Sequence, residues 1–204
     1  FALAKVPLGI KVCLVVISVI FIGFFINYFV SSLDVSYVTS SGRHAYDGEY
    51  QKIITREGQY DGKLARFLIQ DRNLSAAAFV DSDELVYEYT KYYALYAIFN
   101  PNIQEAFIIG GGAYSVPKAL LRDFTHINVD VAEIEPSLFD LGKSYFNVPD
   151  DPRLQNFVED GRRFLVDSPK KYDLIFSDAY SSLYSTPSHL MTQEFFKIAK
   201  DKLS

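Results

Sequence analysis

The order of apolar and polar positions predicts a sheet of buried strands in the second half of the chain. Short apolar runs alternate there with segments of helical periodicity. The expected strands are 106–110, 128–133, 155–159 and 172–178, and the expected helices are 116–124, 136–144, 161–167 and 190–202. Because these strands are apolar almost throughout and alternate with helices, the pattern predicts an α/β fold, a doubly wound parallel sheet with helices on both faces.

Ahead of this sheet, shorter runs bounded by turn residues predict a small antiparallel β unit. Its strands are expected at Tyr50–Thr55, Lys63–Gln70 and Leu74–Val80, with turns at Gly58–Gly62 and Asp71–Asn73. A helix is expected to follow, from Asp83 to about Phe99. A stripe of large apolar residues predicts that one side of this helix faces the core; the stripe is Leu85, Tyr89, Tyr92, Tyr96 and Phe99.

The start of the chain differs from the rest. Residues Val12–Val30 contain no charged side chain and one strongly polar residue, Asn27. About twenty such residues span the core of a bilayer, so we expect a transmembrane helix; a signal peptide and a buried core helix are the alternatives. The sequence therefore predicts an integral membrane protein. The domain that follows is expected on the cytoplasmic side, although the flanking charges do not decide the orientation.

These elements divide the chain into four segments. We expect a transmembrane segment at 1–30, a linker at 31–48, a small β domain at 49–82 and a Rossmann-like domain at 83–204. The chain begins at Phe1 rather than Met, and it ends after four strand–helix units, whereas doubly wound sheets usually carry more strands. We therefore expect a fragment whose last domain is incomplete at its C-terminal end.

Composition argues against several classes of function. The single cysteine, Cys13, cannot form an intramolecular disulfide or a cysteine metal site. The three histidines, His44, His126 and His189, are scattered along the sequence, so no metal is expected. The formal net charge of −5 argues against a nucleic-acid partner, because neutralising phosphates requires a basic face.

A glycine turn joins the first strand of the expected parallel sheet to its helix. Gly110–Gly112 follow the apolar run directly, Ser115 is the expected N-cap, and Pro117 lies in the first helical turn. Such a turn lets polar atoms of a ligand approach the backbone closely, although the same turn also occurs without a ligand. The next strand ends in Glu133, about twenty residues further on, the spacing from which an acid commonly binds ribose hydroxyls.

Acidic residues follow the expected strands. They are Glu133, Glu135, Asp160 and Asp178. Ligands of open α/β sheets bind at the carboxyl ends of the strands, so we expect these side chains to gather around the glycine turn. Singly, each is also explained as an exposed loop acid or a helix cap. Together they predict one pocket shaped for an adenosine.

Five motifs, in this order and spacing, resemble the spermidine synthase family of aminopropyltransferases: GGGAYSVP, AEIEP, DDPRLQNFVEDGRRFL, YDLIFSDAY and HLMTQEFF. The resemblance covers roughly Glu49 to Leu203. It is closest to a membrane-associated branch in which the synthase-like domain follows transmembrane helices. It implies a methyltransferase-like Rossmann sheet behind a small N-terminal β domain, in agreement with the pattern of strands and helices.

The resemblance also implies roles on the donor side of the site. The donor would be decarboxylated S-adenosylmethionine or S-adenosylmethionine, with no metal. Glu133 would bind the ribose hydroxyls, and Asp160 would face the adenine amino group. The full set of implied donor-binding residues is Gln51, Gly110, Gly111, Gly112, Glu133, Asp160 and Gly161.

On the acceptor side the resemblance is less complete. Asp178 matches the family's catalytic aspartate, and Tyr87 matches a tyrosine that lines the acceptor site. Ala113 stands where the family has an aspartate that holds the amino group of the decarboxylated donor. Tyr89 stands where an acid is expected, and Ala179–Ser182 replace the family's second acid after Asp178.

The function that this resemblance implies is transfer of an aminopropyl group to a small-molecule amine acceptor, with Asp178 and Tyr87 as the catalytic residues and Asp178 as the general base. A methyltransferase that uses S-adenosylmethionine is an alternative, because a shared fold does not decide which group is transferred. A non-catalytic nucleoside-sensing domain of a membrane protein is the other alternative. The sequence does not reveal the oligomeric state, and a homo-oligomer is one option.

Overall fold

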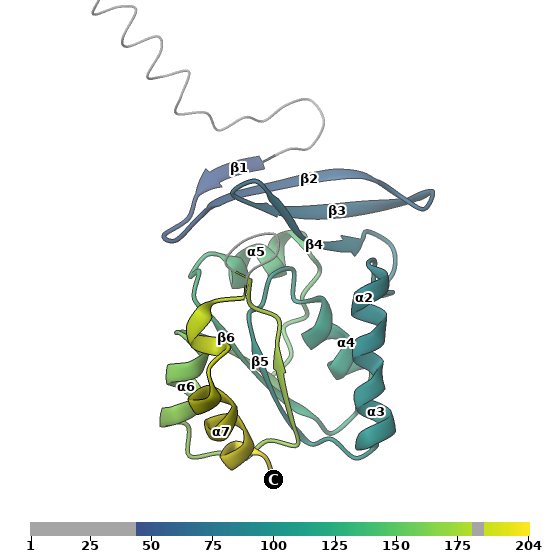
Figure 1. Ribbon diagram of the computed structural model, residues 1–204. Helices are drawn as coiled ribbons and strands as arrows, with labels where there is room; N and C mark the ends of the chain where they lie inside the picture. Colours follow the sequence, from purple (N-terminus) through teal and green to yellow (C-terminus); the bar gives the residue numbers. More distant parts are fainter. Residues whose placement is uncertain (1–43, 181–185) are drawn as a thin grey trace, which may run out of the picture. The chain divides into compact units, whose positions relative to one another are not determined.

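In the computed structural model, residues 44–180 and 186–204 are described, and their strands form two four-stranded sheets (Figure 1). All of these residues belong to one unit, Val38–Ser204. The expected transmembrane segment, Val12–Val30, lies outside the described residues.

The expectation of an integral membrane protein is corrected. None of the helices found in the described ranges is both long and apolar enough to cross a bilayer. A membrane location therefore has no support from the part of the chain that the structure describes.

The first sheet is antiparallel, with its strands in chain order. The strands are β1 (His44–Asp47), β2 (Lys52–Tyr60), β3 (Lys63–Gln70) and β4 (Asn73–Phe79). Asp61 and Gly62 form the two-residue loop between β2 and β3, and both have positive φ, +49° and +74°. A loop of this composition and twist is the tight turn that antiparallel hairpins favour. The predicted antiparallel unit is confirmed, and β1 adds a strand to it from within the expected linker.

The second sheet is parallel, in the order β7–β6–β5–β8. Its strands are β5 (Glu105–Ile109), β6 (Asn128–Glu133), β7 (Leu154–Val158) and β8 (Leu174–Ser177). The helices that alternate with them are α4 (Ser115–Asp123), α5 (Leu138–Tyr145), α6 (Gly161–Asp167) and α7 (Gln193–Lys202), with a short 3-10 turn, η3 (Ser188–Leu190), before α7. The predicted α/β fold with a parallel sheet is thus confirmed.

Side chains of β5 alternate between the two faces of this sheet. Ala106 and Ile108 enter a core cluster that also contains residues of α4 and α5, whereas Phe107 and Ile109 enter a second cluster with residues of α6 and α7. In Figure 1, α6 and α7 accordingly lie on one side of the sheet and α4 on the other. Burial on both faces explains why this strand is apolar at consecutive positions.

The antiparallel sheet packs against the first of these clusters. Ile53, Leu68 and Ala78 are among its buried members. The guanidinium of Arg66, on β3, donates a hydrogen bond of 2.7 Å to the carbonyl oxygen of Tyr145, at the end of α5. The sheet is therefore held next to the helices that flank the parallel strands.

The segment expected as one helix from Asp83 to Phe99 is divided instead. It forms α2 (Glu88–Lys91), a 3-10 turn η2 (Tyr92–Leu95) and α3 (Tyr96–Phe99). Of the expected stripe, Tyr92 and Phe99 are 67% and 87% exposed, and only Tyr96 packs against a core cluster. The prediction was wrong because a 3-10 turn has three residues per turn, which changes the side that faces the core. Tyr93 now faces inward.

The expected N-cap of α4 was also wrong. Tyr114 occupies that position, with a left-handed φ of +55°, and Ser115 is the first helical residue. The hydroxyl of Ser115 instead donates a hydrogen bond to the carbonyl oxygen of Ala77, on β4. This residue therefore ties the helix to the antiparallel sheet.

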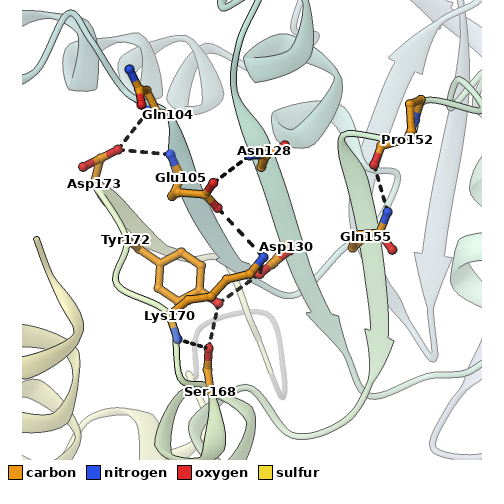
Figure 2. A network of polar contacts seen from close by, with 10 residues as sticks. All are labelled: Gln104, Glu105, Asn128, Asp130, Pro152, Gln155, Ser168, Lys170, Tyr172 and Asp173. Atoms are coloured by element: carbon orange, nitrogen blue, oxygen red, sulfur yellow. Dashed lines mark hydrogen bonds and ion pairs between the residues drawn. The ribbon is translucent and has the colours of Figure 1, made fainter.

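A buried polar network lies on the parallel sheet, around a side chain of β6 (Figure 2). Asp130 is 1% exposed, and its Oδ2 atom accepts hydrogen bonds from Lys170 Nζ at 2.8 Å and from the hydroxyl of Tyr172 at 3.0 Å. The Tyr172 hydroxyl is also 3.1 Å from Ser168 Oγ. The network connects the loop after α6 to the middle of the sheet.

We predict that Tyr172→Phe lowers the free energy of unfolding by about 1–3 kcal/mol, because it removes a hydroxyl bonded to a buried carboxylate while it keeps the ring that packs on Phe107. Urea denaturation measures the difference. The matched control is Tyr92→Phe, at an exposed position, for which we expect a change within about 0.5 kcal/mol. Equal stability of both variants would show that the Tyr172 hydroxyl contributes nothing to stability.

Candidate active site

A cavity of about 420 Å³ lies at the carboxyl ends of the parallel strands, between them and the antiparallel sheet. The residue or residues directly after each of β5, β6, β7 and β8 line it, among them Gly110–Gly112, Ile134, Asp160 and Asp178. Gln51 and the stretch around β4 line the opposite side. The structure therefore brings the predicted glycine turn into one cavity with three of the four predicted acids, Glu133, Asp160 and Asp178.

The glycine turn after β5 requires glycine. Gly110 has a φ of +91°, a conformation that side chains with a Cβ rarely adopt. A Cβ atom on Gly111 would lie 2.4 Å from Cζ of Tyr114, whose ring is fully buried below the turn. The hydroxyl of Tyr114 donates a 2.7 Å hydrogen bond to Asn156 on β7, which anchors the ring beneath the turn.

Glu133, at the end of β6, binds this turn directly. Its Oε2 atom accepts hydrogen bonds from the amide of Gly111 at 2.7 Å and the amide of Gly112 at 3.4 Å, and Oε1 accepts one from the amide of Glu135 at 2.9 Å. The side chain is 6% exposed. Burial raises the pKa of this carboxyl, and the hydrogen bonds from the amides oppose the rise. Glu133 also lines the cavity. Its contact with a ribose stays a prediction.

Asp160 both caps α6 and faces the cavity. Its Oδ1 atom accepts a hydrogen bond of 2.9 Å from the amide of Arg163, and Oδ2 lies 2.7 Å from Nε2 of His189. A Cβ atom on Gly161 would lie 2.3 Å from Cγ2 of Ile109, so the first turn of α6 is pressed against β5. The explanation of Asp160 as a helix cap is therefore correct, and it does not remove the side chain from the cavity.

Asp178 follows β8 and is half-buried at the rim. Its backbone amide donates to the carbonyl oxygen of Ile109 at 2.9 Å, and its Oδ1 atom accepts a hydrogen bond of 3.1 Å from the hydroxyl of Tyr93. Burial raises the pKa of Asp178 to about 6, and the hydrogen bond from Tyr93 opposes this rise. A carboxylate with a pKa in this range is suited to accept a proton near neutral pH.

Three tyrosines lead from the antiparallel sheet to Asp178. The rings of Tyr87 and Tyr89 are stacked at 5.8 Å, and the ring of Tyr93 meets Tyr89 edge-on at 5.8 Å. Burial raises the pKa of Tyr87 to about 12, Tyr60 adds to the rise, and the charge of Arg56 opposes it. Burial and the charge of Asp178 likewise raise the pKa of Tyr89 and Tyr93, so the three phenols are neutral at physiological pH.

Glu135 does not belong to the cavity, which corrects the expectation that it would gather there with the other acids. It is 1% exposed and accepts hydrogen bonds from the hydroxyl of Ser137 at 2.6 Å and the amide of Tyr50 at 3.0 Å. Burial by itself would raise its pKa, but these hydrogen bonds outweigh burial and lower it. Glu135 thus fixes the loop before β2, next to Gln51.

Sequence reasoning missed two side chains of the site. Tyr93 was not singled out, although it lies four residues after Tyr89 in a helical stretch and so falls on the same side. His189 was seen only as a scattered histidine, and no local signal could have paired it with Asp160, which lies 29 residues earlier. Ala113 lines the cavity and is 1% exposed, as a small residue packed into the core.

A parallel sheet with a glycine turn after its first strand and carboxylates at its strand ends defines a Rossmann-like α/β domain. Residues 93–204 match the spermine/spermidine synthase domain family. The chain belongs to that family.

The curated relatives that the chain matches are named polyamine aminopropyltransferases. The chain is 28% identical over 166 residues to a polyamine aminopropyltransferase of Vibrio vulnificus, covering 79% of this chain and 55% of the relative. It is 31% identical over 153 residues to one of Alkaliphilus metalliredigens, covering 72% and 51%. The chain thus spans about half the length of these curated relatives.

A solved structure shows the same fold. The crystal structure of a probable spermidine synthase from Corynebacterium glutamicum superposes with a TM-score of 0.71 at 22% sequence identity, covering 81% of this chain and 61% of that one. At this identity the likeness speaks for the fold. The more specific resemblance to a membrane-associated branch receives no support from these comparisons.

We predict that Asp178→Asn stabilises the ligand-free protein at pH 7.5, by about 1–3 kcal/mol. The pKa of Asp178 is raised from 3.8 to about 6, so between these values the folded protein holds a proton that the unfolded chain releases. The free energy of unfolding therefore falls as pH rises through this window, and it stays lower above the window. Asparagine cannot ionise, so the variant does not lose this free energy.

Unfolding free energies measured from pH 3.5 to 8 test this prediction. The matched control is Asp150→Asn, whose carboxylate is 98% exposed, and its stability should follow the unmodified protein at every pH. A stability difference for Asp178→Asn that does not change with pH would contradict the assignment of the buried charge.

Proposed function

We propose that this chain carries the donor-binding and catalytic half of an aminopropyltransferase, which moves an aminopropyl group from decarboxylated S-adenosylmethionine to an amine acceptor with Asp178 as general base. The observation that carries the proposal is the half-buried Asp178, with a raised pKa, in the same cavity as the glycine turn. Membership of the spermine/spermidine synthase domain family supports it.

On this proposal the donor's nucleoside lies along the glycine turn. Glu133 takes the ribose hydroxyls, Asp160 and Gly161 face the adenine, and Gln51 closes the site from the antiparallel sheet; all of them line the cavity. Nε2 of His189 lies 2.7 Å from Oδ2 of Asp160 and so orients that carboxylate toward the adenine. The sulfonium end of the donor then points toward Asp178.

The reaction is a displacement at the carbon bound to the sulfonium. The lone pair of the acceptor nitrogen forms the new C–N bond, the C–S bond breaks, and its electron pair goes to sulfur, which leaves as a neutral thioether, methylthioadenosine. The acceptor is an ammonium in water and must give one proton to Asp178 as it attacks. The cavity's main contribution is to hold nitrogen, carbon and sulfur in line.

The raised pKa of Asp178 makes this proton transfer less costly. An amine has a pKa of about 10, so transfer to an ordinary carboxylate is strongly uphill. Raising the carboxyl from 3.8 to about 6 recovers about 3 kcal/mol of that cost. The same burial that destabilises the free protein therefore favours the chemistry.

Ala113 favours a second candidate, methyl transfer from S-adenosylmethionine. It lines the cavity next to the glycine turn and has no charge with which to hold the amino group of a decarboxylated tail. Without that charge, the preference for the decarboxylated donor lacks an obvious anchor. The two candidates differ in the donor that binds and in the group that is transferred.

Calorimetry with decarboxylated S-adenosylmethionine, S-adenosylmethionine and methylthioadenosine separates the candidates. We expect the decarboxylated donor and methylthioadenosine to bind, and mass spectrometry of an incubated amine to show an added aminopropyl group. An added methyl group would establish the second candidate. Failure of all three nucleosides to bind would favour a domain without catalytic activity.

We predict that Asp178→Asn abolishes turnover, a loss of about 100-fold or more, while donor affinity stays within about threefold. In the unmodified protein kcat/KM should fall as pH drops through about 6, as the carboxylate is protonated. Tyr93→Phe removes the hydroxyl that stabilises the carboxylate, so the midpoint should move to higher pH. An unshifted midpoint in Tyr93→Phe, or full activity of Asp178→Asn, would remove Asp178 as the base.

A further inference from the structure

The loop that joins β1 to β2 is bonded to a carboxylate from a distant part of the chain. This hairpin loop, Gly48–Gln51, is closed by a hydrogen bond of 2.9 Å from the amide of Gly48 to the carbonyl oxygen of Gln51. The amide of Tyr50, inside the loop, donates a hydrogen bond of 3.0 Å to Oε2 of Glu135. Tyr50 and Gln51 both line the cavity. The loop therefore carries part of the cavity wall and is tied to Glu135.

The carboxylate lies so close to the hairpin loop that there is no room for a side chain at Gly48. A Cβ atom there would lie 2.5 Å from Oε2 of Glu135 and 2.8 Å from the carbonyl oxygen of Gln51. These distances are shorter than the contacts that Cβ atoms make in proteins. A larger residue at Gly48 would therefore displace the carboxylate or distort the loop.

The backbone of Glu135 is joined to the predicted ribose-binding residue. Its amide donates a hydrogen bond of 2.9 Å to Oε1 of Glu133, whose Oε2 atom accepts one of 2.7 Å from the amide of Gly111. Ile134, between the two acids, lines the cavity and is 42% exposed. Three consecutive residues thus contact the glycine turn, the cavity and the hairpin loop in turn.

Glu135 also has a local role in the turn that leads into α5. Its Oε1 atom accepts hydrogen bonds from the hydroxyl of Ser137 at 2.6 Å and from the amide of Ser137 at 3.3 Å, and Ser137 directly precedes α5. These contacts close the turn whether or not a nucleoside binds. The bond from Tyr50 to the other oxygen is of a different kind, because it joins two sheets across 85 residues of chain.

The link between Glu135 and the hairpin loop is a charged one. The side chain is 1% exposed, and although burial disfavours its charge, the hydrogen bonds from Ser137 and Tyr50 lower the pKa of the carboxyl on balance. Hydrogen bonds to an ionised acceptor are stronger than those between neutral groups. Loss of this acceptor would leave the amide of Tyr50 without its partner and release the loop from the end of β6.

We infer that Glu135 is a positioning residue for the donor: it fixes the hairpin loop Gly48–Gln51 to the end of β6, so that Gln51 and Glu133 contact the same nucleoside. This inference rests on the proposed function and adds to it a residue that acts through Gln51 without lining the cavity. Because coupling between two equilibria is reciprocal, a nucleoside bound to Gln51 and Glu133 also stabilises the bonded form of the loop.

A double-mutant cycle tests whether Glu135 acts through Gln51. The affinity for methylthioadenosine is measured by calorimetry on Glu135→Met, which has a side chain of similar length without an acceptor, on Gln51→Ala and on the double variant. We expect each single variant to bind about fivefold or more weakly, and the double variant to bind no more weakly than the weaker single one. Kinetically, KM for the decarboxylated donor should rise in Glu135→Met while kcat stays within about twofold.

The matched control is Glu88→Met, whose carboxylate is 75% exposed and outside the cavity lining; its affinity should equal that of the unmodified protein. An unchanged affinity in Glu135→Met, or losses that multiply in the double variant, would overturn the inference and leave the proposed function standing. Failure of the unmodified protein to bind any nucleoside would contradict the proposed function itself.

Gly48→Ala gives a second, independent variant. It leaves the carboxylate in the protein but puts a Cβ atom where Oε2 of Glu135 lies, so we expect the same loss of affinity, and again no further loss when it is combined with Gln51→Ala. Full affinity in Gly48→Ala would contradict the close fit of loop and carboxylate as the basis of donor binding.

Hydrogen exchange on the unmodified protein tests the same coupling without any variant. Saturating methylthioadenosine should slow exchange of the Tyr50 amide about fivefold more than that of the Val80 amide, which bonds to the carbonyl oxygen of Leu64 in the same sheet and lies outside the cavity lining. Equal slowing of both amides would mean that the ligand stabilises the whole fold and not this loop, and would overturn the inference even if the variants do not fold.

Discussion

The hydrogen bonds from the amides of Gly111 and Gly112 to Glu133 are the contacts on which the site depends. They join the end of β6 to the turn after β5 and give partners to amides that are removed from water. The ring of Tyr114 supports the same turn from below, where a side chain on Gly111 would collide with it. Because β7 and β8 pair with these two strands, Asp160 and Asp178 are held at the rim of the same rigid corner.

Asp178 shows how this corner combines stability with chemistry. Burial raises the pKa of its carboxyl to about 6, and its one hydrogen bond, from Tyr93, does not cancel the cost. The folded protein thus carries a charge that is poorly solvated in the absence of a ligand. On the proposed function, a cationic acceptor would relieve that cost on binding, so part of the energy that the fold loses at Asp178 would be recovered when an amine binds. Such a trade between stability and function is common at active sites.

The errors of sequence reasoning have identifiable causes. The stripe between Leu85 and Phe99 assumed an unbroken α-helix, and the 3-10 turn η2 changed which residues face inward. Glu135 has the same local setting as the other acids, but the loop before β2 covers it and bonds to it. The membrane assignment rested on composition in a segment outside the described residues, and the described helices do not support it.

The sequence alone determined the strands and helices of the parallel sheet, the glycine turn, and the acids at the strand ends. These are local signals: an apolar run, a turn residue or a capping residue acts on neighbours within a few positions. Only the tertiary structure decided which side chains and amides pair with these acids. Tyr93 and Asp178 are 85 residues apart, and Tyr50 and Glu135 are also 85 apart. Contacts of that range arise when sheets and helices pack together, and no local pattern of residues specifies them.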